Sequence, residues 1–265
     1  YEIVVGLRYL RAKRRNRTIS LNTFVSVTGI TLGVAALIGT VGIMTGVKED
    51  IQSKILGTTA HIIVQDRTKD GMSDYDATAK QVETVTDVVA ATPFILKQVM
   101  LTTPSSAQGV VLRGIDSRRE AKVTALAENL VSGQLEDLGK PVTVKLPPPD
   151  DPSGPLQSSE RPGIILGKEL ALRLGAFPGD AISVVSPTGT ISALGMVPKI
   201  RTFVVAGIFQ SGMYEYDSSL AYIDLAEAQK FFGMGDTVTG IEIKVTDVFH
   251  AGDIARRVEQ TLGFT

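Results

Sequence analysis

Thirty consecutive residues near the start of the chain, 18–47, carry no charged side chain. About 20 apolar residues are enough to cross a lipid bilayer, so this segment is predicted to form one transmembrane helix. The apolar part of a signal peptide is only about 7–15 residues long. The core helix of a soluble protein would carry polar residues along one face. A membrane-spanning helix therefore fits the segment better than either alternative.

Six basic residues and one acidic residue precede the apolar segment. The basic residues are Arg8, Arg11, Lys13, Arg14, Arg15 and Arg17. Basic residues beside a span stay in the cytoplasm, so we expect residues 1–17 inside and everything after residue 47 outside. Ile3, Leu7 and Leu10 recur at helical spacing, which predicts an amphipathic helix. This helix could lie on the inner membrane surface, dock a cytoplasmic partner, or serve only as an anchor.

The charge balance differs between the two sides of the predicted span. Residues 1–17 have a net charge of +5, and the remaining residues have a net charge of −6. A mildly acidic outer region argues against a nucleic-acid partner. The chain has no cysteine, which excludes a disulfide framework and thiol chemistry.

Small residues recur at four-residue spacing along the predicted span. They are Gly29, Gly33, Ala35, Gly39, Gly42 and Gly46. Such spacing lets another helix approach closely in lipid, although glycine is common in membrane helices anyway. No second uncharged run approaches this length, so the expected partner helices belong to other segments. We therefore expect a fragment of a longer membrane protein, cut before further transmembrane helices.

The outer region is predicted to be α+β, with a stalk and two subdomains. Residues 48–58 should continue the membrane helix as a periplasmic stalk. Residues 59–103 and 220–265 read as βα units of a split ferredoxin-like, porter-like layer. They include a helix over 75–91 capped by Asp74 and a final helix stopped by Gly263. Residues 104–219 are predicted to form an inserted β-rich subdomain.

Within the predicted insert and just after it, three features are marked by short sequence signals. Ser117 and Glu120 form the pattern of a capping box for a helix reaching about residue 131. Residues 140–163 hold seven prolines and are predicted to be a structureless, tolerated insertion. Just after the insert, Asp224 is expected to cap a helix that ends at Gly233.

The search for catalytic, cofactor and metal sites is negative. The stretch 163–169 imitates a phosphate loop, but it has three residues between its glycines and Glu after its lysine. His61 and His250 are isolated and lack metal-ligand spacing. The acidic residues at 215 and 217 resemble a polar turn more than a paired catalytic site. No cofactor or enzymatic activity is predicted for this chain.

A loop at 187–199, which has almost no charged residues, is the strongest candidate for a functional site in the sequence. Its predicted contact residues are Pro187, Ile191, Leu194, Met196, Val197, Pro198, Lys199 and the nearby Arg201. An exposed apolar loop is typical of a partner site, and methionine suits an adaptable surface. The alternative is a loop folded over the core.

Motifs along nearly the whole chain resemble one family. They are GLRYLR at 6–11, GI at 29–30, LGVAALI at 32–38, GID at 114–116, GIILG at 163–167, ELA at 169–171, GD at 179–180, SP at 186–187, GIF at 207–209, YD at 216–217 and AQ at 228–229. In this order they resemble the lipoprotein-releasing ABC transporter permeases of the LolC/LolE type, within the MacB/FtsX-like permease class. The resemblance omits the proline-rich segment 140–161, which looks like an insertion.

The resemblance implies a role and a set of partners. Family members have four membrane helices, with this outer domain between the first and second. Two permease subunits pair with a cytoplasmic ATPase dimer, which holds the ATP and magnesium. The complex lifts triacylated lipoproteins from the bacterial inner membrane and passes them to a soluble periplasmic carrier. In the LolC branch a hook-like loop recruits that carrier, and by position it matches residues 187–199.

The transfer of a triacylated lipid needs a continuous apolar route. Exposing roughly 40 CH₂ groups to water would cost on the order of 30 kcal/mol. The predicted walls of such a route are Ile43, Met44, Val47, Ile51 and Ile55. The alternative is that these residues pack on membrane helices outside this chain.

Two other functions stay open at this point. A MacB-like or FtsX-like permease would transmit force to an efflux partner or to a cell-wall hydrolase. A single-pass sensor with an extracytoplasmic ligand domain belongs to a different class. An ATPase domain fused to the full-length chain would favour the MacB-like alternative, and further membrane helices would exclude the sensor.

Overall fold

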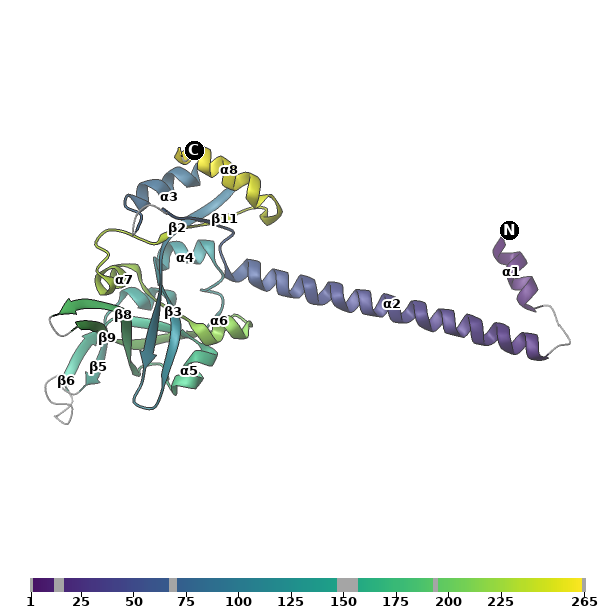
Figure 1. Cartoon of the computed structure of the whole chain (residues 1–265), viewed down its shortest axis with the longest axis horizontal. Helices are drawn as coiled ribbons and strands as arrows, with labels where there is room; N and C mark the ends of the chain where they lie inside the picture. The colour runs from purple at the N-terminus through teal and green to yellow at the C-terminus, as the bar shows by residue number, and fades with distance from the viewer. Residues whose placement is uncertain (1, 12–16, 67–70, 147–156, 193–194, 264–265) are drawn as a thin grey trace. The chain divides into compact units, whose positions relative to one another are not determined.

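The computed structural model describes residues 2–11, 17–66, 71–146, 157–192 and 195–263. The chain divides into two compact units, Tyr1–Ser53 and Lys54–Thr265. The first unit contains the short helix α1 (Glu2–Arg11) and most of the long helix α2 (Arg17–Thr58). The second unit contains every strand of the described chain (Figure 1).

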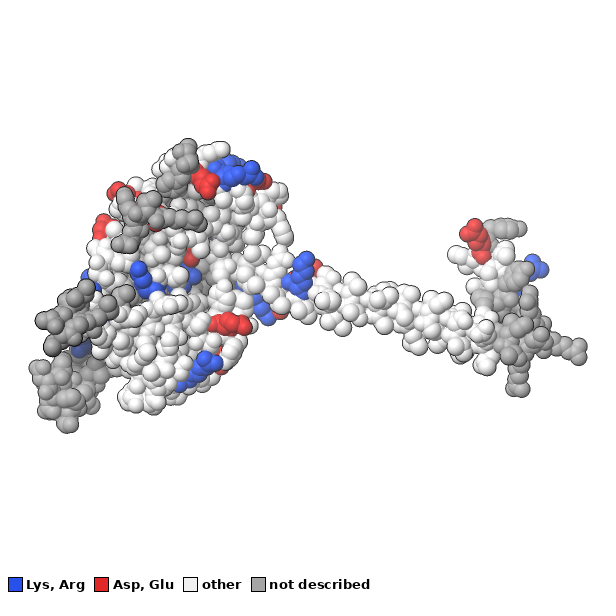
Figure 2. Space-filling model, in the orientation of Figure 1, with Lys and Arg blue, Asp and Glu red and all other residues white. Residues whose placement is uncertain are grey.

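Helix α2 is one continuous helix of 42 residues. At 1.5 Å per residue it is roughly 63 Å long, about twice the hydrocarbon thickness of a bilayer. Within the described residues, one helical segment, Leu21–Gly57, is long and apolar enough to cross a membrane. Its surface is free of charged side chains over most of its length (Figure 2). The predicted span and stalk are thus parts of the same helix.

An α/β layer forms one end of the second unit. Strand β11 (Gly240–Val245) pairs antiparallel with both β1 (Ile62–Val64) and β2 (Val88–Thr102). Helices α3 (Tyr75–Glu83) and α8 (Ala251–Leu262) cover one face of this sheet (Figure 1). The amide Nε2 of Gln81 donates to the backbone oxygen of Thr261 at 2.7 Å. Segments about 180 residues apart therefore fold as one layer, as the sequence predicts.

Six strands close into a ring beside that layer. Each strand pairs with the next one around the ring, which starts at β2. The order after β2 is β3 (Ala107–Ile115), β10 (Leu220–Asp224), β7 (Gly163–Gly167), β9 (Gly195–Phe209) and β8 (Ala181–Ser192), and β8 pairs with β2 to close the ring. The contacts of β10 with β3 and of β7 with β9 are parallel, and the others are antiparallel. The β-rich part is therefore a small closed barrel.

Strand β2 belongs to both the layer and the barrel. Its first half pairs with β11, whereas Met100, Leu101 and Thr102 pair with β8. The predicted boundary at residue 103 falls inside the continuous hairpin of β2 and β3. Strand β10, expected in the porter-like half, lies in the barrel between β3 and β7. The two predicted subdomains therefore share a strand rather than meeting at a linker.

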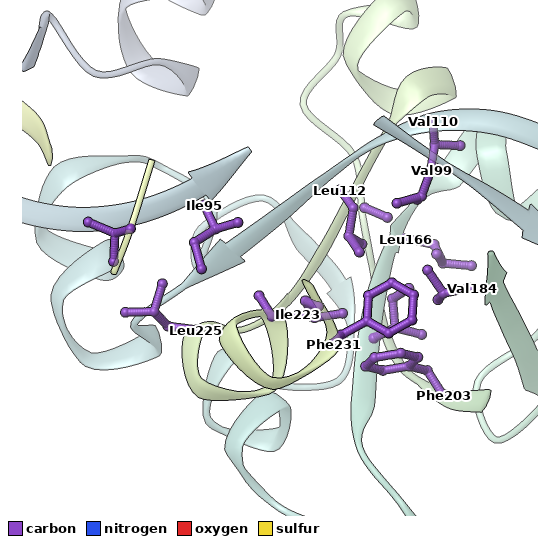
Figure 3. Close-up of a cluster of buried hydrophobic side chains, with 14 of the residues drawn as sticks. Ile95, Val99, Val110, Leu112, Leu166, Val184, Phe203, Ile223, Leu225 and Phe231 are labelled. Carbon is purple, nitrogen blue, oxygen red and sulfur yellow. The ribbon is translucent and has the colours of Figure 1, made fainter. Parts of the chain in front are cut away.

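The main hydrophobic core runs from the layer into the barrel. Helices α5 (Lys168–Leu174) and α7 (Leu225–Phe232) contribute to it. The rings of Phe203 and Phe231 pack edge to face with centroids 6.3 Å apart (Figure 3). Ile95 and Leu112 are fully buried in the same cluster. One continuous core explains why the unit does not divide at residue 103.

A second, smaller core lies around Tyr222 and Phe209. It is bounded by short elements: α4 (Ser117–Val123), β4 (Leu130–Ser132), the 3-10 helix η1 (Leu135–Gly139) and α6 (Tyr214–Ser219). The 3-10 helix η2 (Val248–His250) precedes α8.

Two predicted helices are shorter than expected. The helix predicted over 75–91 ends at Glu83, and Asp87 takes a left-handed φ of 74° just before β2 begins. The β-branched residues at 88 and 89 join the sheet instead. Asp74 itself has a φ of 55° and makes no side-chain cap, so that prediction was wrong.

The helix predicted from Ser117 to about residue 131 ends at Val123. Its cap is Asp116, whose carboxylate accepts from the backbone nitrogen of Arg118 at 3.0 Å. Glu120, assigned to the capping box, is buried inside the protein instead.

The proline-rich segment is not wholly irregular. Strands β5 (Val142–Leu146) and β6 (Gln157–Arg161) pair antiparallel as a separate two-stranded sheet. The prolines at 147–149, 152 and 155 lie outside the described residues. Pairing of the flanking segments, which hold no interior proline, overrides the breaker-rich composition between them.

Other predicted caps are confirmed. The carboxylate of Asp224 accepts from the backbone nitrogens of Ala226 and Glu227. Gly233 and Gly263 end their helices with left-handed φ values of 69° and 73°.

Replacing Gly114 by alanine should destabilise the second unit by about 1–3 kcal/mol. A Cβ at this position of β3 would overlap the Cβ of Ala228 on α7. The measurement is chemical unfolding of the 54–265 unit. Gly109→Ala on the same strand is the matched control, because its Cβ would meet nothing within 4 Å. Equal stability of the two variants would contradict tight packing of α7 on the barrel.

Candidate partner-binding hairpin

The predicted loop at 187–199 is mostly a β-hairpin. Strands β8 and β9 pair from Ala181 and Val204 to Ser192 and Gly195, with a register shift between Ser186 and Thr190. The loop prediction was therefore wrong about the backbone. The run of β-branched residues on both sides of the turn extends the strands beyond the barrel wall.

Gly189 makes the local path of this hairpin possible. A Cβ on Gly189 would overlap the backbone carbonyl of Val197 on the opposite strand. Only glycine allows this approach of the two strands. Gly189, in the sequence Thr-Gly-Thr at 188–190, thus allows the backbone path of β8 where its pairing with β9 shifts register between Ser186 and Thr190.

Several predicted contact residues are exposed on the hairpin. Val197 is 52% exposed, and Pro187 and Pro198 are also exposed. The backbones of Ile191 and Met196 are paired across the strands, while their side chains are not among those described. Leu194 lies outside the described residues. The described apolar side chains at 187, 197 and 198 are thus exposed rather than folded over the core.

The two basic candidates at the hairpin's base differ. Arg201 forms an ion pair with Glu227 of α7, and its guanidinium lies 5.6 Å from the ring centre of Phe203. Lys199 is half-buried. Arg201 therefore ties the hairpin to the barrel, which limits its availability to a partner.

Sequence reasoning missed Ile200. This residue is 64% exposed, between Lys199 and Arg201 on β9. The available signal was the alternation of the strand, which places residues 199 and 201 on one face and 200 on the other.

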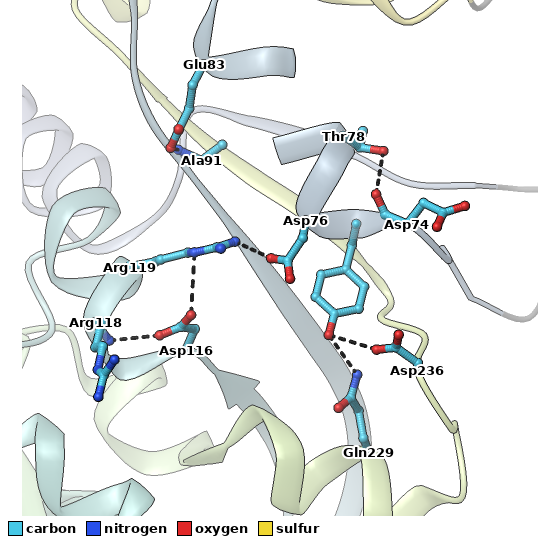
Figure 4. A network of polar contacts seen from close by, with 11 residues as sticks. Asp74, Asp76, Thr78, Glu83, Ala91, Asp116, Arg118, Arg119, Gln229 and Asp236 are labelled. Carbon is cyan, nitrogen blue, oxygen red and sulfur yellow. Dashed lines mark hydrogen bonds and ion pairs between the residues drawn. The ribbon is translucent and has the colours of Figure 1, made fainter. Parts of the chain in front are cut away.

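A polar seam joins the α/β layer to the rest of the unit. Arg119 on α4 contacts Asp76 of α3 at 2.7 Å and Asp116 at 3.5 Å. The hydroxyl of Tyr75 donates to Asp236 at 3.0 Å and accepts from Gln229 of α7 (Figure 4). These contacts fix α3 against both α4 and α7.

A buried charge cluster lies beneath α4. Arg113 on β3 and Glu242 on β11 are both nearly inaccessible to solvent, with Nη2 and Oε2 2.5 Å apart. The guanidinium lies 5.8 Å from the ring centre of Phe94 and 5.7 Å from that of Tyr222. The cation is thus enclosed by one carboxylate and two aromatic faces.

Glu120 adds a second carboxylate to this cluster. It is fully buried, and its Oε1 accepts from the hydroxyl of Thr124 at 3.0 Å. Burial raises the pKa of Glu120 to about 7, although the positive charge of Arg113 opposes the shift. Burial also raises the pKa of Tyr222. The cluster has no opening to a substrate, so we interpret it as structural.

The predicted lipid-route residues are all exposed on α2. Their exposed fractions are 71% for Ile43, 70% for Met44, 53% for Val47, 51% for Ile51 and 42% for Ile55. A Cβ on any of the five glycines of the predicted packing stripe would meet nothing within 4 Å. These apolar residues and glycines of α2 are thus accessible to lipid or to other helices.

The basic segment is only partly described. Arg8 is exposed on α1, and the side chains of Arg11 and Arg17 are not described. Lys13, Arg14 and Arg15 lie outside the described residues.

The rejected chemical sites have structural roles. The stretch 163–167 is the buried strand β7, and Gly167 packs against the backbone of Asp217. The carboxylate of Asp217 accepts from the backbone nitrogen and hydroxyl of Ser211, at 2.7 and 2.8 Å. His61 Nδ1 accepts from the backbone nitrogen of Val245 at 3.2 Å. Among the described residues, no three His, Cys, Asp or Glu side chains gather as metal ligands do.

This architecture defines a class of membrane-associated domain, a long apolar helix followed by a barrel and an α/β layer. Residues 23–261 match the family model of the MacB-like periplasmic core domain. The chain belongs to this family, as a LolC/MacB-like permease segment, and the resemblance noted in the sequence is confirmed.

Its curated relatives include the lipoprotein-releasing system transmembrane protein LolC of two bacteria. The protein of Xylella fastidiosa (strain 9a5c) is 35% identical over 96% of this chain and 56% of its own length. That of Neisseria meningitidis serogroup B is 33% identical over 93% of this chain and 54% of its own length. The chain thus spans about half the length of the curated relatives it matches.

Two solved structures are also similar to the chain. The extracellular domain of the ABC-type transporter YknZ from Gram-positive bacteria has a TM-score of 0.45 and 14% identity, over 76% of this chain and 90% of that one. The periplasmic region of MacB from Actinobacillus actinomycetemcomitans has a TM-score of 0.43 and 13% identity, over 74% and 78%.

Proposed function

We propose that the chain is part of an ABC permease subunit that releases lipoproteins from the bacterial inner membrane. Support comes from 33–35% identity to LolC proteins along nearly the whole chain. The basic segment before α2 favours a cytoplasmic N-terminus and a periplasmic main domain.

The proposed subunit works with proteins that supply what this chain lacks. A cytoplasmic ATPase dimer binds ATP and magnesium. A second permease subunit, homologous or identical, packs beside this one in the membrane. The small-residue stripe from Gly29 to Gly46 is the proposed helix-packing face. Ile43, Met44, Val47, Ile51 and Ile55 line the proposed route for the lipoprotein's acyl chains.

The β8–β9 hairpin is the proposed recruiting site for the periplasmic lipoprotein carrier. The observation that carries this proposal is that the strands of the hairpin present the apolar side chains of Pro187, Val197 and Pro198 to solvent. The resemblance to the LolC branch supports it, because the hook-like loop of that branch matches residues 187–199 by position. A carrier that shields acyl chains must itself have an apolar surface, which suits such a hairpin.

The test is carrier binding by the fragment 48–265. Changing Leu194, Met196 and Val197 to serine should weaken binding by at least about tenfold, since apolar burial of several side chains is lost. The readout is titration calorimetry with the carrier from the same organism. Leu172→Ser is the control, because Leu172 on α5 is 64% exposed and lies outside the hairpin.

Two results would contradict the assignment. A folded fragment that does not bind the carrier would remove the carrier-recruiting role and favour a MacB-like permease acting on an efflux partner. Equal loss of binding in the Leu172→Ser control would show that the hairpin is not the site.

A further inference from the structure

An apolar groove lies on the outer face of the barrel, where Val99 and Val110 of the buried core also contribute to its lining. Its volume is about 460 Å³, and its lining includes Gln98, Met100, Val111, Val185 and Pro187. Met100 is 47% exposed, although it sits in the middle of three paired strands.

The groove follows a row of side chains in register across four strands. Met100 on β2 pairs with Gly109 on β3 and with Val185 on β8. Val185 in turn pairs with Ile200 on β9. Directly paired residues share one face of a sheet, so these side chains form one outer surface. Gly109 leaves space in it, because a Cβ there would meet nothing within 4 Å.

The chemistry of the lining limits what can occupy the groove. None of the described residues that line it is charged, and its polar members Gln98 and Ser219 are neutral. The floor at Met100 is paired on both sides, so it offers no free strand edge to a peptide. A peptide lying there would lose hydration of its backbone polar groups, with only the side chains of Gln98 and Ser219 to replace it. A hydrocarbon chain has no such groups.

We infer that this groove binds one acyl chain, and that it guides the chain towards the β8–β9 hairpin. Pro187 belongs to the groove and also begins the hairpin, which makes the two surfaces continuous. The inference rests on the proposed function for the presence of acylated cargo. Met100 suits the role because its flexible side chain adapts to a mobile hydrocarbon.

The experiment uses the full chain in lipid nanodiscs and photoactivatable palmitic acid with a diazirine in its chain. After irradiation, mass spectrometry locates the labelled peptides. We expect labelling of the β2, β3 and β8 segments that unlabelled palmitic acid competes away. Met100→Gln should reduce it about tenfold, because it places an unpaired amide in the groove. Leu172→Gln on α5 is the matched control and should leave it unchanged.

A second variant distinguishes acyl-chain binding in the groove from non-specific binding to an apolar surface. Gly109→Leu fills the groove while making the surface more apolar, so we expect labelling to fall. A rise in labelling, or label found only on α2, would overturn the inference. Thermal unfolding of each variant verifies that the barrel is intact.

Carrier binding by the same samples distinguishes this inference from the proposed function. Met100→Gln should keep carrier binding while it loses the acyl label. Loss of carrier binding with unchanged acyl labelling would instead make the groove a protein-docking surface and overturn the inference. Failure of the carrier to bind any variant would count against the proposed function alone.

Discussion

Replacing Arg113 by methionine is expected to lower the free energy of unfolding of the 54–265 unit by about 3–5 kcal/mol. The substitution keeps much of the apolar volume between the rings of Phe94 and Tyr222 but removes the buried cation. Glu242 then has no partner for its carboxylate, and Glu120 loses its compensating positive charge. A buried carboxylate without a partner is costly, so the loss should exceed that of most single substitutions.

The measurement is urea unfolding followed by circular dichroism at pH 8. The double variant Arg113→Met, Glu242→Gln should recover part of the loss, because it removes the stranded charge together with the cation. Arg256→Met is the control: its partner Asp253 is solvent-exposed, and exposed pairs contribute only about 0–1 kcal/mol. Equal effects at the two arginines would mean that the buried pair does not stabilise the fold.

Replacing Glu120 by glutamine is expected to remove a pH dependence of stability between about pH 4.5 and pH 7. In the folded protein burial raises the pKa of Glu120 from 4.5 to about 7. The folded state therefore holds the proton more tightly than the unfolded state does. This contribution is fully present below pH 4.5 and is lost as the pH rises through 7. Linkage converts the shift to about 3 kcal/mol.

Glutamine imitates the protonated acid at every pH. The variant should thus match the wild type near pH 4 and exceed its stability by up to about 3 kcal/mol at pH 8. The measurement is a series of urea unfolding curves at these pH values, compared between the two proteins. The comparison cancels the contributions of other titrating groups, such as His250, whose pKa is raised, and Asp247, whose pKa is lowered.

Glu128→Gln provides the control for this series, since Glu128 is exposed five residues beyond the end of α4. It should follow the wild type at every pH. A constant difference between Glu120→Gln and the wild type across the range would show that Glu120 does not titrate there.

Local sequence signals predicted the elements whose stability is local. The caps at Asp224, Gly233 and Gly263 were correct, because a cap depends on a few adjacent residues. The helix over 75–91 was overestimated, because residues from 88 onwards gain more by pairing with β11 than by continuing a helix. The capping-box assignment of Glu120 failed for a related reason: its side chain is drawn inward towards Arg113.

The hairpin shows the same limit at the candidate site. Its apolar composition was visible in the sequence, and Val197 is indeed exposed. The continuation of both strands through residues 187–199 was not visible, since it depends on pairing between β8 and β9, and Ile200 was missed although strand alternation could have indicated it. The ion pair of Arg201 with Glu227 likewise joins residues brought together only by α7.

The sequence by itself determined the long apolar helix, the basic segment before it and the family of the outer domain. These features follow from composition and short motifs along the chain. Only the tertiary structure decided that β2 serves both the layer and a closed barrel, that Arg113 is buried with Glu242 beside the rings of Phe94 and Tyr222, and that Met100, Val185 and Ile200 form one outer row. The physical reason is that strand pairing and burial join residues far apart in the chain, and local sequence carries no record of which partner each will meet.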